Sequence, residues 1–228
     1  MPKRFEHKYW ISWSDYMQLK PLLRTLFSFD PNTDHNGEYN IESVYFDSPD
    51  VRCIREKEDG LEFRKKYRAR CYNSHQSTEI KFEIKYRNKF QIWKNSVKLN
   101  KQEYLNFLHH RVLPVQNDFT KELIHDAKTL CLRPVVIVRY TREVYVYPTS
   151  NVRITFDKYL SHSHFHTDIF QESPHIFAHS KDKLILEIKY NQFLPHLVER
   201  VFSNFLYKRD SISKYLLCYK HSRRIFTS

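Results

Sequence analysis

Apolar and charged residues alternate along much of this chain with a period of two, which is typical of β-strands. The clearest case is TEIKFEIKYR, residues 78–87, where charged side chains from Glu79 to Arg87 occupy every second position. Ile, Phe and Tyr stand between them, so one face of the strand is apolar and the other carries both signs of charge. Similar stretches recur, and the predicted strands cover residues 3–11, 39–47, 62–72, 78–87, 90–98, 134–147, 152–160 and 183–190.

Helical patterns interrupt these strands, which predicts an α+β fold. The chain has no internal repeat or low-complexity linker and only two glycines, so we expect a single domain over residues 1–228. The C-terminal third predicts two helices that separate near residues 210–213. The other expected helices start at Ser14, at Asn100 with Glu103 completing a capping box, and at Thr120.

Charge and cysteine content narrow the class of protein. The 38 Lys and Arg residues exceed the 26 Asp and Glu residues, which gives a formal net charge of +12. Such an excess predicts a polyanionic partner: nucleic acid, polyphosphate, a nucleotide or an acidic membrane face. The four cysteines are far apart and form no CxxC pair, so neither a zinc ribbon nor a disulfide framework is expected. No stretch is long and apolar enough for a membrane span, and we expect a cytoplasmic protein with reduced thiols.

The charged strand faces have two possible arrangements. Turned outward, they form a broad basic surface that suits nucleic acid. Turned inward, they line a basic tunnel, and helices cover the apolar outside; eight strands are about enough to close a small antiparallel barrel. The carboxylates Glu6, Glu83 and Glu187 among the cations favour the tunnel, because carboxylates hold Mg²⁺ or Mn²⁺ against the phosphate oxygens that Arg and Lys bind. A surface for nucleic-acid backbone gains nothing from them, so no nucleic-acid partner is expected.

Eight short motifs, in order, resemble a known family. They are FEHKYWI, ESVYFDSPD, GLEFRKKYRARCY, FEIKYR, VVIVRYTREVY, VRITFD, LILEIKYN and SISKY. Together they resemble the vacuolar transporter chaperone (VTC) domain of the triphosphate tunnel metalloenzyme superfamily, in particular its bacterial branch of polyphosphate polymerase domain proteins. The resemblance implies an eight-stranded antiparallel tunnel barrel, with helices packed on its outside, that binds triphosphate or polyphosphate with a divalent metal.

The resemblance also implies roles for individual residues. Glu187 matches the family's metal-binding glutamate, and Glu6 is a second candidate ligand for Mn²⁺ or Mg²⁺. Ser211 stands where eukaryotic polymerases carry another lysine, which leaves one cation fewer at the tunnel mouth. The expected phosphate-binding and catalytic residues are Lys8, Arg68, Arg70, Lys85, Lys94, Arg139, Arg153, Lys189, Ser213 and Lys214.

Such a site supports phosphoryl transfer from ATP, which requires charge neutralisation and in-line positioning rather than covalent help from the protein. With a polyphosphate chain as acceptor the enzyme is a polymerase, and with water it is a triphosphatase. A binding module for polyphosphate or inositol phosphates, without turnover, is the alternative from another class. The membrane helices of the eukaryotic complexes are not present in the chain, so export of a polymer would need a separate membrane partner.

Several other residues have a simpler interpretation. Four cations on the strands are expected to be solvated or to form surface ion pairs. Three tyrosines are expected to pack in the core or on the outside rather than to stack on a nucleoside. The histidines of SHSHFHTD alternate as zinc ligands can, but no cysteine is near and the segment is expected to be a polar loop. These residues are Arg64, Lys66, Lys81 and Arg87, then Tyr45, Tyr67 and Tyr140, and finally His162, His164 and His166.

Overall fold

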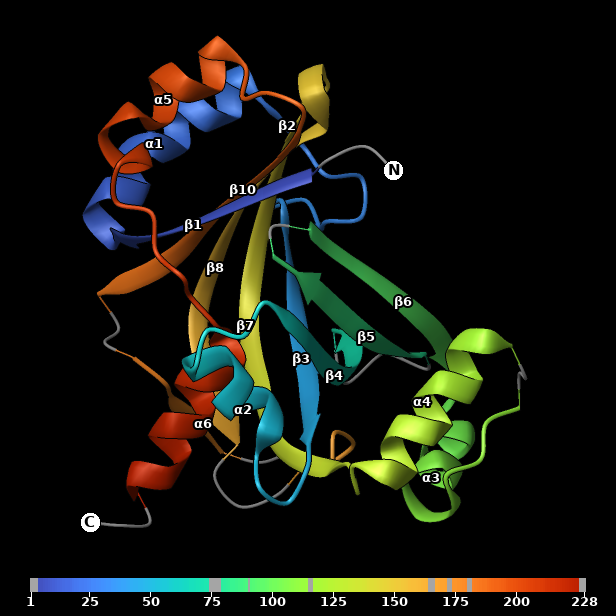
Figure 1. The fold of residues 1–228 in the computed structure, drawn as a ribbon. Coiled ribbons are helices and arrows are strands. Elements are labelled where there is room, and N and C mark those ends of the chain that lie inside the picture. Colours follow the sequence, from blue (N-terminus) through green and yellow to red (C-terminus); the bar gives the residue numbers. More distant parts are fainter. Residues whose placement is uncertain are drawn as a thin grey trace.

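The computed structural model describes residues 4–73, 79–89, 91–114, 117–163, 167–171, 174–179 and 182–225. Ten strands and seven helices follow one another in mixed order (Figure 1). The strands are β1 (Arg4–Ser12), β2 (Ser28–Phe29), β3 (Glu38–Asp47), β4 (Phe63–Tyr72), β5 (Ile80–Asn88), β6 (Gln91–Leu99), β7 (Arg133–Tyr147), β8 (Val152–Ser163), β9 (His175–Phe177) and β10 (Lys183–Asn191). The helices are α1 (Trp13–Leu26), α2 (Arg52–Glu58), α3 (Lys101–His110), α4 (Asp118–Thr129), the short 3₁₀ helix η1 (Thr149–Asn151), α5 (His196–Leu206) and α6 (Lys214–Ile225).

All strands belong to one antiparallel sheet, in the order β1-β10-β8-β7-β3-β4-β5-β6, with β2 paired to β7 and β9 to β8. The eight strands of the main path correspond to the eight predicted strands, and the α+β fold class with helices outside is confirmed. One difference concerns closure: in the described residues the main path ends at β1 and β6, and these two strands do not pair.

Helices α1 and α5 cover the apolar face of the sheet, as expected for a charged interior, whereas α6 packs against Tyr45 on the opposite face. Tyr9 of β1, Phe156 of β8 and Leu186 of β10 are fully buried beneath α1 and α5. Leu23 of α1 and Phe202 of α5 belong to the same apolar cluster. In Figure 1, α1 and α5 lie side by side against this end of the sheet. Burial of each such large side chain contributes about 1.5–3 kcal/mol to the stability of the fold. This packing therefore stabilises the arrangement in which the apolar face of the sheet points outward to the helices.

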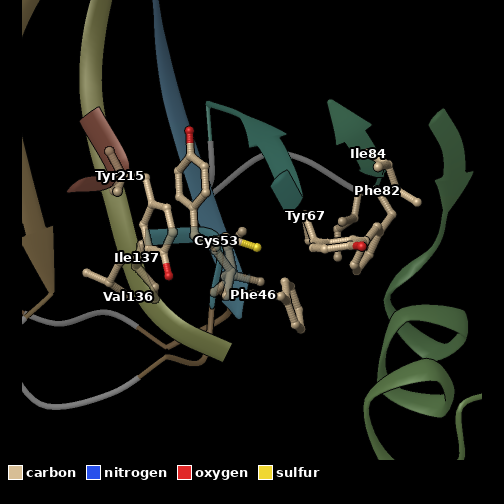
Figure 2. Close-up of a cluster of buried hydrophobic side chains, with 14 of the residues drawn as sticks. Phe46, Cys53, Tyr67, Phe82, Ile84, Val136, Ile137 and Tyr215 are labelled. Carbon is tan, nitrogen blue, oxygen red and sulfur yellow. The ribbon is translucent and has the colours of Figure 1, made fainter. Parts of the chain in front are cut away.

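A second apolar cluster covers the other half of the sheet. Phe82 of β5 packs against Phe46 of β3, with ring centroids 5.1 Å apart, and against Phe107 of α3 at 4.9 Å. Figure 2 shows Phe46 and Cys53 at the centre of this cluster, Phe82 and Ile84 on one side, and Val136, Ile137 and Tyr215 on the other. Helices α2, α3, α4 and α6 therefore all depend on the same core.

Helix starts show where local patterns succeed and fail. The capping box of Asn100 and Glu103 is confirmed, as is the separation of α5 from α6. The start at Ser14 is wrong, because Ser12 is the N-cap of α1 and accepts from the backbone of Asp15. The cap at Thr120 is also wrong; Thr120 occupies the third position of α4, and Asn117 caps the helix. In the described part of the chain, no helix is long and apolar enough to cross a membrane.

Candidate functional site: a charged tunnel face

One face of the sheet carries most of the charged side chains, and the sheet curls so that this face is its inside. Lys85 of β5 lies 3.4 Å from the carboxylate of Glu6 on β1, although β5 and β1 lie near opposite ends of the strand order. Two strands so far apart in the sheet can approach through their charged sides only if the sheet curls and these sides oppose each other. We call the charged, inward face of the sheet the tunnel face. Lys85 and Glu6 thus point inward rather than onto an open surface.

Strand register brings the first group of predicted residues together. Lys8 of β1 is opposite Glu187 of β10, and Lys189 is opposite Glu6 on one side and Arg153 of β8 on the other. The Lys8 ammonium lies 3.0 Å from Glu6, and that of Lys189 lies 2.5 Å from Glu187. Alternation therefore puts cation beside carboxylate between β1 and β10, and β8 adds the cation Arg153 beside Lys189.

These carboxylates are held in the ionised form by the cations around them. Burial alone raises the pKa of Glu187, but Lys189, Lys8 and Arg142 overcome this effect and the pKa falls well below its ordinary value. Burial and Glu187 raise the pKa of Glu6, yet Lys85 and Lys8 lower it on balance. Both side chains are thus anionic acceptors at any physiological pH.

A second group of predicted residues lies on β4, β5 and β6. Arg68 is opposite Glu83 and contacts its carboxylate at 2.7 Å through both Nε and Nη2, while Lys94 of β6 contacts the other oxygen at 2.7 Å. Burial raises the pKa of Glu83, but Arg68, Arg70 and Lys94 lower it to about 2. Among the residues with described positions, no carboxylate lies within ion-pair distance of Arg70, and its guanidinium faces Ser43 Oγ at 3.3 Å.

The chain after α5 closes this side of the tunnel face. The backbone N–H of Asp210 donates to the carbonyl of Lys8 at 2.9 Å, and the Lys8 ammonium donates to the carbonyl of Ile212 at 3.2 Å. These bonds bring the predicted Ser213 and Lys214, at the start of α6, into the site. Lys214 contacts Asp157 of β8 at 2.5 Å.

Arg139 does not lie with the other predicted residues. It is opposite Glu42 of β3 and contacts that carboxylate at 2.8 Å, and both side chains are on the outer face of the sheet. Arg142, three residues later on β7, occupies the tunnel face: its guanidinium forms two bonds to Asp157, of 2.6 and 2.8 Å, and lies 3.5 Å from Glu187. The sequence placed the tunnel arginine of this strand at Arg139, whereas the arginine that lies on the tunnel face is Arg142.

The sequence-based predictions gave Asp157 no role in the site, and they misjudged Lys66. Asp157 shares the alternation of Arg153 and Thr155 in VRITFD, so its position on the tunnel face was detectable; burial raises its pKa, but Arg142 and Lys214 keep the carboxyl ionised. Lys66 was expected to be a solvated charge, yet its ammonium donates to Ser213 Oγ at 2.9 Å. Burial, followed by repulsion from Lys8 and Lys85, lowers the pKa of Lys66 to about 7.

The tyrosines are packed, as expected, but two of them face the tunnel. Tyr45 stacks on Tyr215 of α6, with ring centroids 4.7 Å apart, and its hydroxyl lies 3.5 Å from Arg68. Tyr140 lies beneath the Lys214 ammonium, which is 4.9 Å from the ring centroid. Tyr67 faces outward and donates to Asp126 of α4. Aromatic rings therefore line part of the cationic interior.

The histidine segment contributes no described metal site. His162 is buried at the end of β8, and its Nε2 lies 2.9 Å from Nδ1 of His221 on α6. His164 and His166 lie outside the described residues. Among the residues that the structure describes, no three His, Cys, Asp or Glu side chains form a ready-made metal cluster.

A divalent metal fits the carboxylates of the tunnel face. Mg²⁺ and related ions are commonly held by one or two carboxylates together with substrate phosphate oxygens, so a complete protein cage is not required. Glu187 interacts electrostatically with both Glu6 and Asp157, which places three ionised carboxylates within one charged region. Glu187 and Glu6 would hold the metal, and the bound ion would neutralise charge on the phosphates.

Comparison with known proteins agrees with this geometry. The family model of the VTC domain matches residues 3–223. The chain belongs to the VTC domain family. The resemblance seen in the motifs is thereby confirmed, and the protein is an enzyme of the triphosphate tunnel metalloenzyme type. A triphosphate or polyphosphate substrate and dependence on a divalent metal fit this family.

Solved structures share the fold at low sequence identity. A Hippeastrum protein named as an adenylyl cyclase and described as having a dominant triphosphatase activity matches with a TM-score of 0.53 and 12% identity, over 96% of this VTC chain and 95% of its own. A candidate adenylate cyclase from Bacillus halodurans matches with a TM-score of 0.50 and 13% identity, over 89% and 88% of the two chains. No curated protein matches the chain.

Proposed function

We propose that this VTC domain is a metal-dependent polyphosphate polymerase, which transfers the terminal phosphoryl group of ATP to a growing polyphosphate chain inside the tunnel. The observation that carries the proposal is the convergence of cations and ionised carboxylates from β1, β4, β5, β7, β8 and β10 on the inner face of the curled sheet. The cations would bind the phosphate oxygens, and the carboxylates would hold Mn²⁺ or Mg²⁺.

The ion pairs in the tunnel suggest how substrate is received. Arg142 presents a bidentate fork to the two oxygens of Asp157, and Arg68 contacts one oxygen of Glu83 through both Nε and Nη2. A guanidinium fork fits phosphate oxygens as well as carboxylate oxygens. If Arg142 and Arg68 turn to a bound triphosphate, Asp157 would keep Lys214 and Glu83 would keep Lys94. Lys8, Lys189 and Lys214 would act as point charges around the reacting phosphate.

Catalysis would then consist mainly of positioning and charge neutralisation. The transferred phosphoryl group has negative charge spread over its oxygens in the transition state, and fixed cations stabilise that charge without reorganisation. The acceptor is the terminal oxygen of a phosphate chain, which the same cations can align. We expect the reaction to take place in the cytoplasm, and export of the chain to require a separate membrane protein.

Triphosphate hydrolysis is the second candidate, because water can take the place of the chain and a fold relative is described as a triphosphatase. The deciding experiment is incubation with ATP and Mn²⁺ or Mg²⁺, followed by gel staining for polyphosphate and a phosphate-release assay. Polymer supports a polymerase and phosphate alone a triphosphatase. If neither product forms, the domain is a binding module.

Glu187→Gln tests the metal role in the same assay. The amide keeps the shape of the side chain but removes the charge, so we expect turnover to be lost while tripolyphosphate binding without metal persists. Wild-type activity of this variant at limiting Mn²⁺ would show that Glu187 does not hold the metal.

A further inference from the structure

Four cations extend the tunnel face beyond the predicted site, at the end where β4 begins. Arg64 and Lys66 share the alternation of Arg68 on β4, and Arg87 of β5 is directly opposite Arg64. Lys57, in the last turn of α2, lies near this group. We call Lys57, Arg64, Lys66 and Arg87 the cation row.

The cation row differs from the rest of the tunnel in its partners. Lys66 and Lys57 donate to the hydroxyls of Ser213 and Ser211, at 2.9 and 2.8 Å. The described side-chain hydrogen bonds of Arg64 and Arg87 go to backbone carbonyl groups, those of Glu56 at 3.4 Å and Lys89 at 3.0 Å. In the described part of the chain, no carboxylate lies within ion-pair distance of these four side chains, whereas Lys8, Arg68, Arg142 and Lys189 all have one.

This arrangement is unfavourable in the protein alone. Arg64 faces Arg87 and Lys66 faces Lys85 across the β4–β5 pair, and like charges directly opposite each other destabilise a sheet. Only 7% of the Arg64 surface is exposed, so solvent screens its charge poorly. Burial and the neighbouring cations lower the pKa values of Lys57, Arg64 and Lys66 alike. An anion that neutralises the row would remove this repulsion.

The row is continuous with the proposed triphosphate site. A strand rises about 3.3 Å per residue, so Arg64 lies roughly 13 Å from Arg68, with Lys66 midway between them. A single phosphate group cannot contact both ends of this path. A linear anion with many phosphates can contact each cation in turn, and it does not have to displace a carboxylate to do so.

We propose that the cation row is a second phosphate-chain subsite, which holds the part of a linear polyphosphate that extends beyond the triphosphate in the tunnel. This inference rests on the proposed function, because it identifies the polymer end of the same site. It predicts that the protein binds long-chain polyphosphate more tightly than tripolyphosphate, and that the difference depends on Arg64 and Arg87.

The test compares two probes and three proteins. Tripolyphosphate and long-chain polyphosphate, at matched concentrations of molecules, are titrated into wild-type protein, Arg64→Gln/Arg87→Gln and Lys121→Gln/Lys128→Gln. Lys121 and Lys128 are exposed on α4, so the control variant loses the same charge away from the row. We expect the Arg64/Arg87 variant to lose about tenfold in affinity for the long chain, equivalent to about 1.4 kcal/mol, and to bind tripolyphosphate as wild type does.

Several results would overturn the assignment. Unchanged long-chain affinity, or an equal loss for both probes, would show that Arg64 and Arg87 do not form a separate subsite. An equal loss of long-chain affinity in Lys121→Gln/Lys128→Gln would show that the effect comes from net charge and not from the position of the row. Single-stranded DNA is the comparison polyanion; if its binding depends equally on Arg64 and Arg87, the row is a general polyanion surface.

Folding and turnover are measured separately. Removing two like charges relieves repulsion, so the empty Arg64→Gln/Arg87→Gln variant should melt at the wild-type temperature or above it. The single variant Arg87→Gln repeats the test at the more exposed position. If the wild-type protein makes no polymer but still binds long-chain polyphosphate more tightly than tripolyphosphate, only the polymerase proposal is refuted. Polymer synthesis without such a preference would refute only the subsite.

Discussion

Arg142 and Arg139 provide a matched pair on one strand, because three residues separate them and they face opposite sides of the sheet. Arg142→Ala should weaken the binding of tripolyphosphate, whereas Arg139→Ala should leave it unchanged. The Arg142 side chain is only 9% exposed and forms two charge-assisted bonds to Asp157. Arg139 is bound to Glu42 on the outer face.

The expected loss follows from this burial. Truncating one partner of a buried, hydrogen-bonded charge pair costs about 2–5 kcal/mol of binding free energy, which corresponds to about 30-fold to several thousand-fold in Kd. Asp157 retains Lys214 at 2.5 Å, so the variant does not leave a buried carboxylate without a cation. Arg142→Lys keeps the charge but loses the fork, and its affinity should lie between those of wild type and Arg142→Ala.

Isothermal titration calorimetry with tripolyphosphate in metal-free buffer measures these affinities directly. Circular dichroism checks that each variant is folded before titration. Wild-type affinity in Arg142→Ala, or an equal loss in Arg139→Ala, would refute the placement of Arg142 in the anion site and of Arg139 outside it.

Two further predictions concern stability. Tripolyphosphate should raise the melting temperature, because a ligand that binds only the folded state stabilises it by about 2.7 kcal/mol at a hundredfold excess over Kd. The rise in melting temperature should be smaller in Lys8→Ala and Lys214→Ala. If duplex DNA stabilises the protein equally well, the site is an open surface and not a tunnel. Lys66 should contribute an increase in the free energy of unfolding as pH rises from about 7 towards the ordinary lysine pKa of 10.5, because the unfolded chain binds a proton at Lys66 that the folded protein has lost. Urea titrations across this range should show a smaller increase in Lys66→Met, and an identical pH dependence in both proteins would show that Lys66 does not titrate near neutrality.

Much of this fold follows from local pattern. Alternation with a period of two depends only on the geometry of an extended chain, so the eight main strands were predictable, and so were the charged and apolar faces of β1, β4, β5, β8 and β10. Carboxylates interspersed among the cations indicated a tunnel, and the order of short motifs indicated the family. The capping box at Asn100 was equally readable, because its bonds join residues three apart.

Other features depended on how distant strands meet. Arg139 and Arg142 must face opposite sides of β7, but only the register with β3, which sets Arg139 beside Glu42 and Arg142 beside Tyr39, decides which one enters the tunnel. Lys66 was predicted to be a solvated charge, but in the structure its ammonium donates to Ser213, which precedes α6 and lies 147 residues away in the chain. That no described carboxylate lies within ion-pair distance of the cation row is likewise a property of tertiary structure. Charge along a strand is set by sequence, whereas its neutralisation depends on which side chains folding brings within a few ångströms.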